Sequence, residues 1–66
     1  MRPLTPAERH VLQCYANGAA GMKGVAKLRG TSMDTTRTHL KAVREKLAAT
    51  HTAHAVAIGL RLGLIN

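Results

Sequence analysis

The chain has 66 residues, which is the length of one small domain. Its ten Lys and Arg residues outnumber three acidic residues, so the formal net charge is +7 at pH 7. A single cysteine cannot form an internal disulfide, no apolar run approaches a membrane span, and the N-terminus lacks a signal-peptide pattern. We therefore exclude a disulfide-stapled secreted scaffold and a two-domain enzyme. A cytoplasmic protein with a polyanionic partner is favoured, nucleic acid before an acidic membrane.

Glycines, prolines and capping residues divide the single domain, residues 1–66, into four segments without strand-like alternation. The first is predicted to be a helix running to about Asn17. Its start, Thr5-Pro6-Ala7-Glu8, matches a capping box, and Gly18 suits a left-handed stop. Glu8 falls on the apolar stripe, where we expect it half-buried and paired with a cation. The other residues of this stripe are Val11, Leu12 and Tyr15.

The second helix is predicted from about Met22 to Arg29, and it is weak because an interior glycine costs roughly 1 kcal/mol relative to alanine. Gly30-Thr31 then turns the chain, and Ser32 can cap the next helix. The residues expected to point inward are Val25, Ala26 and Leu28.

The third helix, from about Met33 to Ala48, shows the clearest pattern, with one apolar stripe and one polar, basic stripe more than a quarter-turn away. The expected core stripe comprises Met33, Thr36, Leu40, Val43 and Leu47. The polar stripe comprises Asp34, Arg37, Thr38 and Lys41, with Arg44 at its edge.

The fourth helix is predicted from about Thr52 to Leu62 and is apolar almost all round. A second apolar face in so small a protein indicates a partner. We therefore expect a homodimer through this helix, in which Ala55 and Gly59 allow close approach. The other expected interface residues are Ile58 and Leu62.

A short helix, a glycine-containing turn, a cap and a longer helix with a basic stripe form the layout of a helix-turn-helix. The second helix of such a pair enters the DNA major groove with its N-terminal residues nearest the base edges. Arg37 can then present its guanidinium to guanine, Thr38 can contact a thymine methyl or a base acceptor, and Lys41 can reach a base acceptor or a phosphate. Ser32 and Thr35 can meet a phosphate at the helix start.

Three further cations can contact phosphates, although each also suits a plain solvated surface. Arg44 borders the polar stripe, and Lys23 and Lys27 lie on the second helix. Asp34 can accept from a cytosine amino group, but we favour an interaction with the dipole at the helix start.

Seven segments of the chain match, in order and spacing, the pieces of a known DNA-binding domain. They are Leu4–Leu12, Ala16–Gly18, Val25-Ala26, Ser32–Leu40, Lys46-Leu47, Ala53–Val56 and Leu62–Ile65. Over residues 4–65 the sequence thus resembles the LuxR-type (GerE-type) four-helix DNA-binding domain, an all-α helix-turn-helix fold. The resemblance implies a bacterial transcription regulator that contacts bases through Arg37, Thr38 and Lys41, and a homodimer through the last helix. Thr31 and Thr36 replace apolar family residues, so we expect low stability.

The prediction is thus a small bacterial or phage-type regulator of transcription, associated with the nucleoid and binding double-stranded DNA. The spacings of His10 with Cys14 and of His51 with His54 suit metal ligands, but we expect neither a metal nor a cofactor. No catalytic constellation is visible, so we expect no enzyme. The alternatives are a module of the same fold that inhibits a regulator or RNA polymerase, a sigma-factor region, and a non-specific basic binder.

Overall fold

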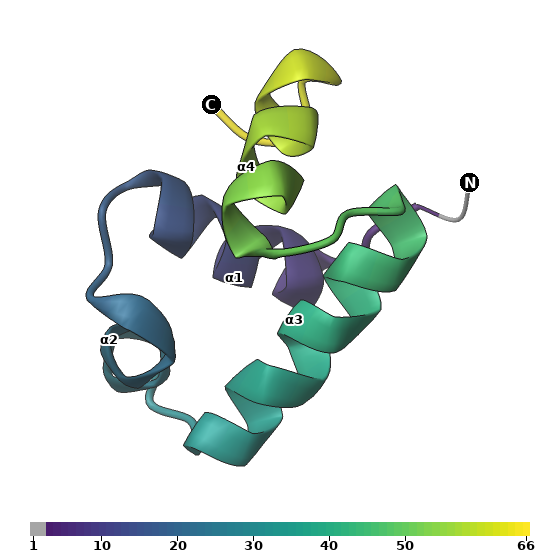
Figure 1. Ribbon diagram of the computed structural model, residues 1–66. Helices are drawn as coiled ribbons and strands as arrows, with labels where there is room; N and C mark the ends of the chain where they lie inside the picture. The colour runs from purple at the N-terminus through teal and green to yellow at the C-terminus, as the bar shows by residue number, and fades with distance from the viewer. Residues whose placement is uncertain (1–2) are drawn as a thin grey trace.

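The computed structural model describes residues 3–66, which form four α-helices with no strand among them (Figure 1). The helices lie close to their predicted bounds, and the all-α, four-helix prediction is confirmed. Helices α1 and α3 each pack against all the others, whereas α2 and α4 do not contact one another. The bounds are α1 Pro6–Ala16, α2 Gly21–Arg29, α3 Met33–Leu47 and α4 Thr52–Arg61.

Local sequence sets the start and the end of α1. The hydroxyl of Thr5 accepts from the backbone N–H of Glu8 at 3.2 Å, and the N–H of Thr5 donates to the Glu8 carboxylate at 2.9 Å. This is the predicted capping box. Gly18 follows the helix with a φ of +92°, the left-handed conformation expected of the glycine stop.

The α2–α3 turn is built by three consecutive residues. Gly30 ends α2 in the left-handed region with a φ of +67°. The N–H of Thr31 then donates to the Ala26 carbonyl at 3.0 Å, and the hydroxyl of Ser32 caps α3 by accepting from the N–H of Thr35 at 3.1 Å. These bonds satisfy backbone groups at both helix ends, so the angle between the two helices is set by the turn itself.

The core consists of two clusters that share α1 and α3. One joins α1, α3, α4 and both chain ends, and the other joins α1 and α3 to α2. Because α3 contributes to both clusters, one stripe along its length is fixed against the rest of the domain. The buried residues of the first cluster are Leu4, Leu12, Val43, Leu47, Ala55 and Ile65, and those of the second are Val11, Cys14, Val25 and Leu40.

Two side chains expected in the core are exposed instead. Leu28 is 69% exposed, because Val25 and Ala26 set the buried direction of α2 and Leu28 lies more than a quarter-turn from it. Met33 is 42% exposed, since it is the first residue of α3 and burial on this stripe begins one turn later, at Thr36.

The expected roles of Ala55 and Gly59 in a dimer interface are corrected by the packing of α4. Ala55 is fully buried, and Gly59 lies so close to α1 that a Cβ on it would sit 2.9 Å from Cδ2 of Leu12. The same Cβ would lie 3.2 Å from Cγ1 of Ile65. The close approach that these small residues allow is therefore made within one chain, and they have no surface to offer to a second copy.

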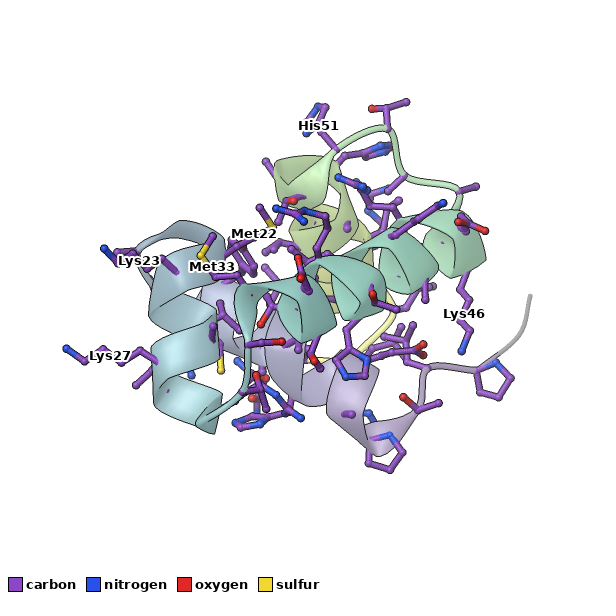
Figure 2. All side chains as sticks on the ribbon, turned by 90° about the horizontal axis from the view of Figure 1, so that it is seen from below. Met22, Lys23, Lys27, Met33, Lys46 and His51 are labelled. Atoms are coloured by element: carbon purple, nitrogen blue, oxygen red, sulfur yellow. The ribbon has the colours of Figure 1, made fainter. Side chains whose placement is uncertain are left out.

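A buried ion pair joins the start of α1 to the end of α3. Figure 2 shows its lysine, Lys46, extending from the last turns of α3. The Nζ atom of Lys46 lies 2.6 Å from Oε1 of Glu8, and the two side chains are only 12% and 8% exposed. Glu8 is thus buried and not half buried as expected. It is paired with a cation as expected, and that cation is Lys46. Burial opposes ionisation of Glu8, but hydrogen bonds from Lys46 and Thr5 and the lysine charge outweigh it and lower the pKa.

The close packing of α4 predicts opposite effects for two glycine-to-alanine substitutions. Gly59→Ala should destabilise the domain by about 1–3 kcal/mol, because its Cβ would overlap a core leucine. Gly24→Ala should instead stabilise it by about 0.5–1 kcal/mol, since alanine favours the helix and the nearest neighbour of its Cβ is an ordinary 3.4 Å away. Urea unfolding followed by circular dichroism measures both. An equal gain from the two substitutions would contradict the packing of α4 on α1.

The ion pair predicts a pH-dependent contribution to stability. Glu8→Gln should cost about 1–3 kcal/mol at pH 7, because it leaves the Lys46 ammonium buried without its anion. The pKa of Glu8 is lower in the folded state than its ordinary value of 4.5, so the contribution is complete above that value. It is lost as the pH falls through the lower folded pKa. The stability curves of the two proteins should therefore converge in acid, and parallel curves would contradict the pair.

Candidate nucleic-acid interface

The outer face of α3 is polar and lies opposite the buried stripe. Asp34, Arg37, Thr38 and Lys41 are all exposed, as their positions on the helix predicted. Arg44 is half buried at the edge of this face. The fold therefore keeps the three predicted base-contacting side chains accessible on one helix.

Arg37 is held by the acid one turn before it. Its Nη1 lies 2.9 Å from Oδ1 of Asp34, in a pair whose side chains are 59% and 89% exposed. So exposed a pair contributes little to stability, because both groups remain hydrated. Asp34 sits in the first turn of α3, where its charge also suits the helix dipole. The pair therefore orients the guanidinium and offsets part of its charge.

The hydroxyl groups at the start of α3 are already engaged. Ser32 and Thr35 share the cap, with 3.0 Å between their side-chain oxygens, and Thr38 donates to the Asp34 carbonyl at 3.0 Å. Thr38 therefore has no proton left to donate to a ligand, but it keeps its methyl group and the lone pairs of its hydroxyl oxygen. At the cap, the first backbone N–H groups of the helix are the donors that an anion can use.

The two α2 lysines form a second basic area. Lys23 and Lys27 are exposed one turn apart, and Figure 2 shows both extending from α2 away from the rest of the domain. Their spacing places them on one face of the helix, where both can reach the same strand of a polyanion.

One polar contact that sequence reasoning missed joins α2 to α1. Arg29 Nη1 lies 2.6 Å from Nδ1 of His10, across 19 positions of sequence, and no local pattern indicates this pairing.

Thr36 is fully buried and donates to the Ser32 carbonyl at 3.3 Å, the back-bond that a buried threonine needs. The hydroxyl of Thr31 is buried without a hydrogen-bond partner among the described residues. A buried hydroxyl without a partner lowers the free energy of unfolding, which is in line with the low stability expected from the sequence.

Three of the four histidines, His10, His51 and His54, form hydrogen bonds within the domain. His10 bonds to Arg29, and His51 is the N-cap of α4, accepting from the N–H of His54 at 3.2 Å. Within residues 3–66, no three His, Cys, Asp or Glu side chains come together as a metal-binding group would require. None of the four described helices is long and apolar enough to cross a membrane.

Helices α2 and α3 thus form a capped helix-turn-helix, and the second of them has an exposed, basic face. The family model described as bacterial regulatory proteins, luxR family, matches residues 2–58. The chain belongs to the luxR family. No curated protein and no solved structure matches it.

Membership confirms the resemblance found in the sequence and identifies α2 and α3 as the helix-turn-helix of a luxR-family domain. The family consists of DNA-binding regulators rather than enzymes. The match ends at Ile58, within α4, so the exposed leucines that follow lie outside it.

The Asp34–Arg37 pair predicts that this luxR-family domain gains DNA affinity when the acid is neutralised. Asp34→Asn should strengthen duplex binding several-fold, because it removes a negative charge from the outer face of α3 and releases Arg37. Glu45→Gln is the matched control: it removes the same charge from an exposed α3 residue that forms no ion pair within residues 3–66. Fluorescence anisotropy at fixed salt measures both. An equal gain in both variants would assign the effect to net charge alone.

Proposed function

We propose that this protein is a bacterial or phage-type transcription regulator that places α3 in the major groove of double-stranded DNA. The observation that carries the proposal is the division of α3. One stripe is fixed in both core clusters, while the outer face leaves Arg37, Thr38 and Lys41 exposed. An α-helix fits the major groove, where each base pair offers a distinct set of donors and acceptors.

Each side chain of the outer face then has a role set by its chemistry. Arg37 presents two parallel donors to the O6 and N7 atoms of guanine, at the cost of its exposed pair with Asp34. Thr38 contacts a thymine methyl, since its hydroxyl proton is already donated to the Asp34 carbonyl. Lys41, one turn further on, donates to a base acceptor or to a phosphate. The base contacts therefore lie towards the N-terminal end of α3, which is the part of a recognition helix nearest the base edges.

Phosphate contacts come from three places around the helix. The capped start of α3, between Ser32 and Thr35, offers the backbone N–H groups of Met33 and Asp34 to one phosphate, since the N–H of Thr35 is bonded to the Ser32 hydroxyl. Lys23 and Lys27 reach the backbone from α2, and Arg44 reaches it from the edge of α3. These contacts position the helix without selecting a sequence. In this role the protein acts on nucleoid DNA in the cytoplasm.

A comparison of two variants tests this proposal, after selection from random duplexes has defined the preferred site. Arg37→Ala should cost about 1–3 kcal/mol on that site and relax the preference at one position, with little loss on scrambled duplex. Lys23→Ala should weaken all duplexes alike and reduce the salt slope by about one. If Arg37→Ala weakens both duplexes equally, Arg37 is a phosphate contact. If it changes neither, α3 does not lie in the groove and the protein-interaction alternative is the better one.

We further propose a homodimer through the exposed side of α4. Ile58 is half buried and Leu62 is 50% exposed, and the two lie one turn apart at the end of α4, an apolar surface in a chain of net charge +7. Two copies joined at this helix present two recognition helices, which suits inverted half-sites about one helical turn apart. This arrangement places the two α3 helices on one side of the duplex.

Sedimentation equilibrium at high micromolar concentration, with and without DNA, measures the dimer. The protein should be dimeric, and Leu62→Glu should make it monomeric by placing a charge in the apolar contact. Leu28→Glu is the control, because Leu28 is a leucine with still greater exposure, 69%, on α2. A monomer under all conditions, or equal loss of the dimer in both variants, would contradict an α4 interface.

A further inference from the structure

A pocket lies between α2 and α4, two helices that do not contact one another. It has a volume of about 420 Å³, within the range of small-molecule sites. Side chains from all four helices line it, so its shape depends on the whole fold. The lining residues are Tyr15, Met22, Arg37, Leu40, Arg44 and Thr52.

The lining combines two arginines, Arg37 and Arg44, with apolar residues. None of the six residues is acidic. Arg37 is paired with Asp34, but Arg44 forms no salt bridge within residues 3–66 and is half buried. Planar guanidinium groups bind carboxylate and phosphate oxygens through paired donors, which makes an oxyanion the ligand that fits this pocket.

The other lining residues supply hydroxyl and apolar groups, and these determine what the rest of the ligand must be. Burial raises the pKa of the Tyr15 phenol, against the opposing charge of Arg44, so this group remains a hydrogen-bond donor at neutral pH. Thr52, the first residue of α4, supplies a second hydroxyl. Met22 and Leu40, with the ring of Tyr15, provide a surface for an apolar or aromatic body.

We propose that this pocket binds a small organic anion, a carboxylate or phosphate monoester with an apolar or aromatic body. Its oxyanion bonds to Arg44 and Arg37, and its body lies against Met22 and Leu40. Because both arginines are also proposed DNA contacts, the occupied pocket withdraws them from DNA. This last consequence rests on the proposed function, whereas binding of the anion does not.

Titration calorimetry on the full chain at constant ionic strength tests the pocket with three probes. Phenyl phosphate carries both the anion and the body, inorganic phosphate lacks the body, and benzyl alcohol lacks the anion. Phenyl phosphate should bind at least about tenfold more tightly than either of the others, a difference that one well-placed contact supplies. Phenyl phosphate should also shift the NMR signals of the Met22 methyl group and the Tyr15 ring.

Variants separate the pocket from general charge. Arg44→Gln and Tyr15→Phe should each weaken phenyl phosphate binding by about tenfold, with helicity by circular dichroism unchanged. Arg9→Gln removes the same charge from an exposed residue outside the pocket and should have no effect. Equal binding of phenyl phosphate and inorganic phosphate, or equal loss in Arg44→Gln and Arg9→Gln, would overturn the site.

A competition experiment tests the consequence for DNA. Phenyl phosphate should displace a labelled duplex at concentrations where sodium chloride of the same ionic strength does not. Displacement by both salts alike would overturn the competition while calorimetry still reports on the pocket. A protein that binds phenyl phosphate but no duplex of any sequence would contradict the proposed function and leave the site standing.

Discussion

The burial of one stripe of α3 is the constraint on which the other features of the domain depend. Leu40 anchors α3 to α1 and α2, while Val43 and Leu47 anchor it to α1 and α4. With Thr36 fully buried and bonded back to Ser32, the helix cannot turn about its axis without exposing this stripe. The side chains that face solvent are thereby fixed. They include the arginine, threonine and lysine that suit base contacts, so the same packing that stabilises the fold also selects the binding face.

Ordinary core packing is supplemented at two points by polar contacts that hold α1 against its neighbours. The buried Lys46–Glu8 pair holds α1 to the end of α3, and the contact between Arg29 and His10 holds α2 to α1. In a chain this short the apolar core is small, so such contacts matter for the relative positions of the helices. Because α2 and α4 lack a comparable contact, a pocket remains between them, beside the two arginines of α3.

Much of the fold could be predicted from the sequence because it is encoded locally. The capping box at Thr5, the glycine stops and the Ser32 cap act over a few residues, and the stripes of α3 follow from helical periodicity. The orientation of α4 could not be predicted in this way, since a helix that is apolar all round does not show which side faces the core. The sequence alone therefore does not show that Ala55 and Gly59 face the core. The partners of Glu8 and His10 are 38 and 19 residues away, and the pocket joins four segments, so no local pattern indicates them.

The placement of α3 in the major groove is tested most directly by an NMR titration of the nitrogen-labelled chain with its preferred duplex. If α3 lies in the major groove, the largest amide shifts should cover Ser32 to Lys41, with smaller shifts around Lys23 and Lys27 on α2. The buried stripe at Val43 and Leu47 should change little, because it faces the core. Shifts concentrated on α4, with the first half of α3 unaffected, would show that DNA is bound elsewhere and would contradict the placement of α3 in the major groove.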